Sequence, residues 1–144
     1  MTAPFPGAAR RVRAGATALA VASAIAATTL AGCGAQAADL FDVIRSGTIP
    51  GADVTLVPSG DGSVLCGHRR HQLPDKLLLK AENFDLSYHA KRHEALPSGP
   101  NPVYTYVVRT PDGYFSYSDD SPHLGKLLRA LAAWTFTVAK HICR

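Results

Sequence analysis

The chain has 144 residues and a formal net charge of +4, from 15 lysines and arginines against 11 aspartates and glutamates. Three of the arginines precede residue 33 and no acid does, so residues 33–144 carry 12 basic and 11 acidic side chains, a net charge of +1. A nucleic-acid partner requires a basic stripe or patch, and this nearly neutral balance argues against one. The length of the same segment suits one small domain.

The first 32 residues have the layout of an export signal. Arg10, Arg11 and Arg13 are followed by AGATALAVASAIAATTLAG, an apolar run of mostly small residues without a charge. A basic head, an apolar middle and small residues at the end are the parts of a secretory signal peptide. The alternative is a membrane-spanning helix of about 20 apolar residues, which this run approaches in length, although glycine, threonine and serine dilute it.

The end of this run decides between the two. Leu30-Ala31-Gly32-Cys33 resembles the lipobox of bacterial lipoproteins, in which a branched apolar residue and two small ones precede a cysteine. The resemblance implies that residues 1–32 are removed and that the Cys33 thiol takes a diacylglycerol group and becomes the acylated N-terminus. It also implies a protein held by its lipid at the extracytoplasmic face of the cell membrane. The alternative is a chance cysteine in an ordinary signal peptide, and the export route stays open.

Residues 33–51 are expected to form the lipidated N-terminus and a tether. The segment GAQAA has nothing to bury, and Asp39–Ser46 (DLFDVIRS) places apolar residues on one side of one or two helical turns. Glycine and proline within residues 47–51 then interrupt this pattern. We therefore expect one small domain over residues 52–144.

Two further cysteines remain once Cys33 is acylated. Cys66 and Cys143 then form an even pair outside the cytosol, where disulfides form and persist. A metal site or a catalytic thiol needs partners at set spacings; Cys66 has His68 and His71 nearby, but Cys143 stands almost alone. We therefore predict a disulfide between Cys66 and Cys143.

The rest of the chain alternates between strand and helix patterns. ADVTLVP and SVLCGHRRHQL flank the turn SGDG as two strands, and Pro74 suits the first turn of a helix. VYTYVVRT and YFSYS flank Pro-Asp-Gly, which predicts a hairpin because proline presets the turn and glycine accepts a positive φ. Asp120 or Ser121 then caps a long final helix with Pro122 in its first position. The core face of the first helix is expected to take Leu77, Leu78, Ala81, Phe84 and Tyr88.

These elements predict an α+β fold. The expected order is β-β-α-β-β-α, with an antiparallel sheet of about four strands and two helices on one of its faces. If Cys66 lies on the second strand, its disulfide joins the sheet to the end of the last helix.

The histidines are the residues most suggestive of a metal site. His68 and His71 lie close together, and His89 and His93 have the i, i+4 spacing at which two imidazoles can share a metal on one helical face. A zincin requires H-E-x-x-H with glutamate as general base, whereas Ala90 occupies that position and two cations lie between these histidines. We therefore expect surface histidines, no metal site, no cofactor and no catalytic constellation, and we interpret Asp119 and Asp120 as helix-capping acids.

The predicted second hairpin is rich in tyrosine. Neighbouring residues of a strand point to opposite faces, so some of these rings face outward, and tyrosine is enriched at binding hot spots. We select Tyr106 and Tyr117 as possible partner contacts.

The stretch from Val54 to Trp134 resembles emfourin-type domains in layout. The shared pieces are a leading strand with an S-G turn, a helix introduced by L-P, a Y-x-Y-x-V strand, a D-G turn, a strand ending in acids and a leucine-rich last helix. Emfourins are small proteinaceous inhibitors of thermolysin-like metalloproteases. The lipobox and the two cysteines are not part of that pattern, and no inhibitory residue is transferred.

Together these patterns favour a membrane-anchored, non-enzymatic module that binds an envelope or secreted protein, with protease inhibition as one form of that activity. The alternative is a small hydrolase or a metal-dependent enzyme that uses the histidines.

Overall fold

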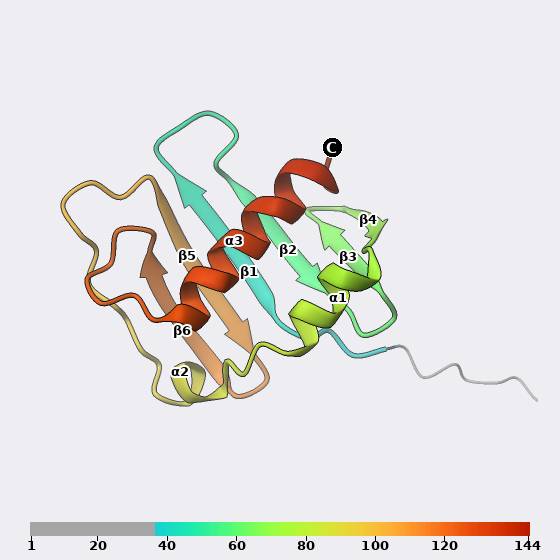
Figure 1. Ribbon diagram of the computed structural model, residues 1–144, viewed down its shortest axis with the longest axis horizontal. Coiled ribbons are helices and arrows are strands. Elements are labelled where there is room, and N and C mark those ends of the chain that lie inside the picture. The colour runs from blue at the N-terminus through green and yellow to red at the C-terminus, as the bar shows by residue number, and fades with distance from the viewer. Residues whose placement is uncertain (1–36) are drawn as a thin grey trace, which may run out of the picture. The chain divides into compact units, whose positions relative to one another are not determined.

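The computed structural model describes residues 37–144, so Cys33, the leader and the first part of the expected tether lie outside the described residues. This part of the chain forms six strands and three helices, whose arrangement can be followed in Figure 1. In chain order they are β1 (Asp42–Gly47), β2 (Val54–Pro58), β3 (Ser63–Cys66), β4 (Arg69–Gln72), α1 (Asp75–Glu82), α2 (Ser87–Lys91), β5 (Tyr104–Thr110), β6 (Gly113–Ser118) and α3 (Lys126–His141).

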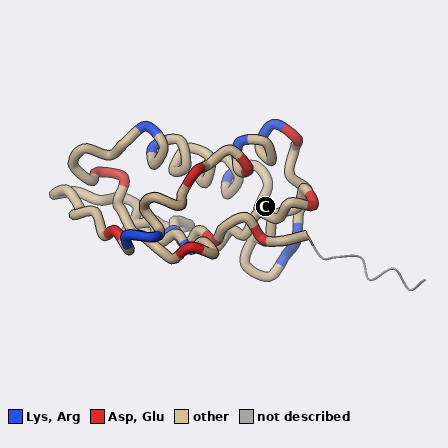
Figure 2. The backbone as a smooth tube through the Cα atoms, turned by 90° about the horizontal axis from the view of Figure 1, so that it is seen from below, with Lys and Arg blue, Asp and Glu red and all other residues tan. Residues whose placement is uncertain are grey.

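The strands form one antiparallel sheet in the order β4-β3-β2-β1-β5-β6. Strand β1 lies in the middle, where Val43 pairs with Leu56 of β2 on one side and Val108 of β5 on the other. After β4 the chain leaves the sheet, forms α1 and α2, and returns beside β1. Seen from the side in Figure 2, the helical segments form a layer on one side of the sheet.

The core lies between this sheet and α3. Alternate residues of the strands point toward the helix, because successive side chains of a strand face opposite sides. On α3 the buried residues recur with helical spacing, which turns one stripe of the helix toward the sheet. The strand residues of the hydrophobic core are Val43, Leu56, Val64, Tyr106, Val108, Phe115 and Tyr117, and the stripe on α3 is Leu128, Leu131, Trp134, Thr135 and Val138.

The segment expected to be a helical tether is the central strand β1, so the prediction for Asp39–Ser46 is wrong. Phe41, Val43 and Arg45 are all buried while Asp42 and Ile44 are half-buried, which is the two-residue period of a strand. Because Arg45 is charged yet points inward, the sequence does not show the alternation of apolar and polar residues that is typical of a strand. The folded domain therefore begins before residue 52.

The expected second strand is also divided. Gly67 adopts a φ of +60°, which glycine tolerates without steric cost, and it turns the chain so that β3 and β4 pair as a hairpin, with Cys66 opposite Arg69. The α+β class and the helical layer on one face are confirmed, whereas the expected four strands, two helices and element order are wrong.

Each of the two expected helices has one boundary that differs from the predicted one. Helix α1 ends at Glu82 and α2 begins anew at Ser87 because Asp85 accepts hydrogen bonds from the backbone nitrogen and the hydroxyl of Ser87. Tyr88 is consequently 61% exposed instead of buried. Helix α3 begins at Lys126 and not at Pro122, because Pro122 and His123 form a turn in which His123 has a φ of +59°.

The disulfide between Cys66 and Cys143 is present, as predicted. The two Cα atoms lie 5.6 Å apart and the cysteines are 77 residues apart in the chain. The bond joins the end of β3 to the residues that follow α3, so it attaches the C-terminal end of that helix to the sheet.

Candidate functional site

The two tyrosines selected as partner contacts are buried. Tyr106 is 2% exposed and Tyr117 is 1% exposed, and their rings stack with centroids 4.7 Å apart. Tyr117 also donates from its hydroxyl to the carbonyl of Leu128 at 3.4 Å. Desolvation raises the pKa of Tyr106 to about 12 and raises that of Tyr117 further. Their expected role as partner contacts is therefore wrong, because both rings belong to the core.

The paired histidines do not share a helical face. Helix α2 ends at Lys91, and His93 lies beyond it with a φ of +48° and its ring 4.8 Å from that of Tyr114. His89 instead makes a hydrogen bond with Glu94 through its Nδ1. Within residues 37–144 no group of three or more His, Cys, Asp or Glu side chains could hold a metal ion.

Asp119 and Asp120 bind the loop before β5 instead of capping α3. Asp120 accepts hydrogen bonds from the backbone nitrogens of Gly99 at 3.0 Å and Asn101 at 2.7 Å. Asp119 accepts from the backbone nitrogens of Val103 at 3.1 Å and Tyr104 at 3.2 Å. The capping prediction is therefore wrong, and these acids hold the proline-rich loop in place.

An apolar groove lies between α1 and α3. Its volume is about 910 Å³. Trp134 and Phe84 form its floor together with Leu77, and the two rings meet edge to face with centroids 6.3 Å apart. The residues that line it are Pro74, Lys76, Leu77, Leu79, Lys80, Asn83, Phe84, Leu127, Ala130, Ala133, Trp134 and Thr137.

Short and long side chains together shape this groove. The short side chains of Ala130 and Ala133 leave space on the side of α3 that faces α1. On α1, Leu79 is 58% exposed and forms the raised edge of the groove. The indole nitrogen of Trp134 donates to the carbonyl of Leu77 at 2.9 Å, which joins the two helices at the floor. The groove thus has a fixed base and an exposed leucine at its rim.

The groove is also positively charged. Of the described residues that line it, Lys76 and Lys80 are the charged ones, and both lie on α1. They are four residues apart, so they project from the same side of the helix. A ligand that fits this surface combines apolar side chains with acidic ones.

This groove was missed in the sequence, although one signal points to it. The segment DKLLLKAE places three leucines in succession on a short helix. Consecutive residues of a helix are about 100° apart, so three of them cannot all face one core. Leu79 is the leucine that faces outward, and its partners on α3 depend on long-range packing that the local sequence does not encode.

Comparisons of the chain with protein-family models, with curated proteins and with solved structures found no match. The lipobox and emfourin resemblances therefore stay predictions. In residues 37–144 the structure contains no helix with the length and apolar character needed to span a membrane.

Proposed function

We propose that this protein is a lipid-anchored, extracytoplasmic and non-enzymatic module that binds another protein of the envelope or a secreted protein through the groove between α1 and α3. The observation that supports the proposal is the groove itself, which exposes Leu79 beside a floor of aromatic and aliphatic side chains. Exposed apolar surface of this kind is typical of protein-binding sites.

The chemistry of the groove favours an amphipathic helix as the ligand. A groove between two helices accepts the apolar face of a third helix, whose anchors recur at i, i+3, i+4 and i+7. Lys76 and Lys80 lie along the α1 side of the groove and would pair with acids beside those anchors. The proposed partner segment is therefore a short helix with leucine-like anchors and acidic flanks.

Protease inhibition is the form of binding that the emfourin resemblance suggests. A metalloprotease would then be the partner. Its segment in the groove would have to be a short helix with leucine-like anchors and acidic flanks. Inhibition of a thermolysin-like protease by the full chain, abolished by substitution of Leu79, would identify this partner class.

A photoreactive amino acid at position 79 tests the proposal in intact cells. We expect it to crosslink a specific protein at a segment that mass spectrometry shows to be an amphipathic helix with acids. Tyr114 is 54% exposed on β6 and serves as the matched control position, which should not capture that segment. Equal capture of the same segment from both positions, or capture from neither, contradicts the proposed site.

The anchor has a separate test. Mass spectrometry of the mature chain should find an acylated Cys33 as its first residue, and Cys33→Ser should leave the protein uncleaved or released from the membrane. A mature chain that begins elsewhere and carries no acyl group contradicts the lipobox prediction without affecting the groove.

A further inference from the structure

Arg45 of β1 is a buried cation that its surroundings satisfy only in part. The side chain is 5% exposed and lies on the helical side of the sheet. Its Nε donates to the carbonyl of Ala52 at 2.7 Å, and its Nη2 makes a longer contact of 3.4 Å with the carbonyl of Gly51. The guanidinium also lies over the ring of Tyr104, 4.8 Å from its centroid, while Nη1 is buried without a hydrogen-bond partner.

This guanidinium also lacks a counter-ion. The ion pairs formed within residues 37–144 involve Arg70, Lys91 and Arg109, and His89 contacts Glu94; none of these contacts involves Arg45. Buried charges are normally paired, since the loss of hydration is costly and must be offset by a partner. Arg45 therefore has both a charge and a donor available for an anion.

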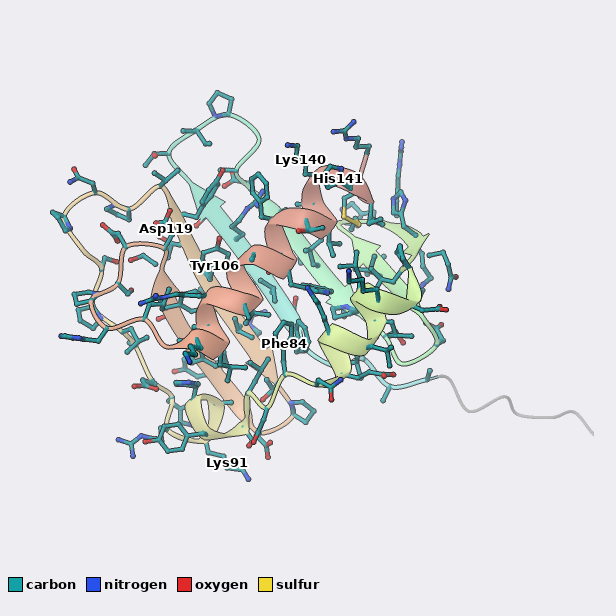
Figure 3. All side chains as sticks on the ribbon, in the orientation of Figure 1. Phe84, Lys91, Tyr106, Asp119, Lys140 and His141 are labelled. Carbon is teal, nitrogen blue, oxygen red and sulfur yellow. A yellow bond between two sulfur atoms is a disulfide. The ribbon has the colours of Figure 1, made fainter. Side chains whose placement is uncertain are left out.

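Two hollows meet at Arg45. One, of about 330 Å³, extends toward the end of α3 and is lined by Tyr104, Phe136 and Lys140. The other, of about 440 Å³, runs between the ends of β1 and β2 to the disulfide. Volumes of this size accommodate small organic ligands. Figure 3 shows Lys140 near the C-terminal end of α3.

The lining contains a second cation and one acid. Lys140 lies with its Nζ 5.7 Å from the ring centroid of Phe136, so its charge is at the wall of the smaller hollow. Asp53 lines both hollows, and its Oδ1 accepts from the backbone nitrogen of Gly47 at 3.3 Å. The acid opposes anions, and it opposes a dianion more strongly than a monoanion.

We propose that this pocket binds a small monocarboxylate with an apolar or aromatic body. The carboxylate accepts two hydrogen bonds from Nη1 and Nη2 of Arg45, the fork geometry in which guanidinium and carboxylate match. It displaces the Gly51 carbonyl, whose contact with Nη2 is the longer of the two, and this displacement also opens access to Nη1, which is buried before the ligand enters. The body of the ligand lies between Tyr104 and Phe136, and Lys140 adds a second charge at the mouth. This pocket is separate from the groove, so its test does not depend on the proposed function.

The test titrates the full chain in detergent with sodium benzoate, inorganic phosphate and benzyl alcohol, and follows the Nε–H signal of Arg45 by NMR. Benzoate should bind saturably and shift that signal, and benzyl alcohol should bind at least roughly tenfold more weakly because it lacks the charge. Binding of phosphate without benzoate overturns the monocarboxylate assignment. Failure of both anions to saturate overturns the site.

Two surface variants are expected to change the affinity for benzoate in opposite directions. Lys140→Gln should weaken benzoate binding roughly twofold to fivefold, and Asp53→Asn should strengthen it by a similar factor, because each removes one exposed charge near the ligand. Arg45→Met should abolish binding, but loss of a buried side chain can also unfold the domain, so the surface pair is decisive. Benzoate binding that neither surface variant changes contradicts the proposal.

Discussion

At the scale of single residues, Asp119 and Asp120 hold residues 97–104, the loop before β5 and the first residue of that strand, through four backbone amides. Desolvation opposes ionisation of Asp120, but hydrogen bonds from Ser118, Asn101 and Gly99 outweigh it and lower its pKa below the ordinary value of 3.8. A carboxyl whose pKa is lower in the folded state stabilises the fold above its unfolded pKa. This contribution is lost as the pH falls through the lower, folded value.

Substitution of either aspartate should therefore break the hydrogen bonds from the two backbone amides that donate to it. We expect Asp120→Asn to speed hydrogen exchange at Gly99 and Asn101, and Asp119→Asn to speed it at Val103 and Tyr104, each serving as the control for the other. Acidification below the folded-state pKa of Asp120, which is lower than the ordinary 3.8, should reproduce the first effect in the unmodified protein. Unchanged exchange at Gly99 and Asn101 in Asp120→Asn would refute this role.

Gly113, at the start of β6, is a second position where one residue type is required. Its φ is +142°, and an added Cβ would lie 2.5 Å from the carbonyl oxygen of Ala90 in α2. Gly113→Ala should therefore lower the free energy of unfolding by about 1 to 3 kcal/mol, the usual range for backbone strain at such a position, as measured by urea denaturation. Gly60→Ala is the control, because its Cβ would meet only the carbonyl of Ala38 at 3.8 Å. Equal losses in the two variants would contradict the explanation.

At the scale of elements, the disulfide is the main constraint on the C-terminal end of α3. A bond between cysteines 77 residues apart stabilises a domain by on the order of 4 kcal/mol in the chain-entropy model. Each kcal/mol corresponds to about 4 to 8 °C for a domain of this size. Reduction should thus lower the melting temperature by roughly 15 °C or more, and Cys66→Ala with Cys143→Ala should reproduce the loss and be insensitive to reductant.

The outcome that would contradict this is a melting temperature that stays constant while mass spectrometry shows both thiols to be free. The pocket around Arg45 offers a further readout, since Cys143 lines both of its hollows. Release of the helix end should weaken benzoate binding along with stability.

The elements differ in how far local sequence determines them. The β5–β6 hairpin follows from its proline, its glycine and its flanking aromatic residues, and the stripe on α3 follows from its 3.6-residue period. Strand β1 was missed because Arg45 occupies an inward position in the middle of its alternation. The pairing of β1 with both β2 and β5 is set by contacts between distant segments, which no local pattern encodes.

The two candidate sites, unlike the disulfide, could not be predicted from the local sequence. The cysteine pair could be predicted because the number of cysteines can be read from the sequence, and the two that follow the expected lipobox form an even pair. The groove and the pocket each require surfaces from separate elements, and the tyrosines chosen as contacts proved to be core because burial depends on which face α3 covers.

At the scale of the whole molecule, the nearly neutral part of the chain from residue 33 to residue 144 has positive charges at two apolar surfaces. Residues 33–144 have a net charge of +1, yet Lys76 and Lys80 line the groove, and Arg45 and Lys140 line the pocket. Both surfaces therefore favour ligands that combine an apolar part with a negative charge. The larger of them is the proposed protein-binding site.

A charge-swap experiment tests this central proposal most directly. The partner segment captured from position 79 is synthesised as a peptide, and its affinity is measured for the unmodified chain and for Lys76→Glu with Lys80→Glu. We expect the double substitution to weaken binding by roughly tenfold or more, because like charges then face each other across the groove, and a peptide with its acids replaced by lysine should restore it. Equal affinity of the original peptide for both proteins, or no recovery with the lysine peptide, would contradict the groove as the binding site.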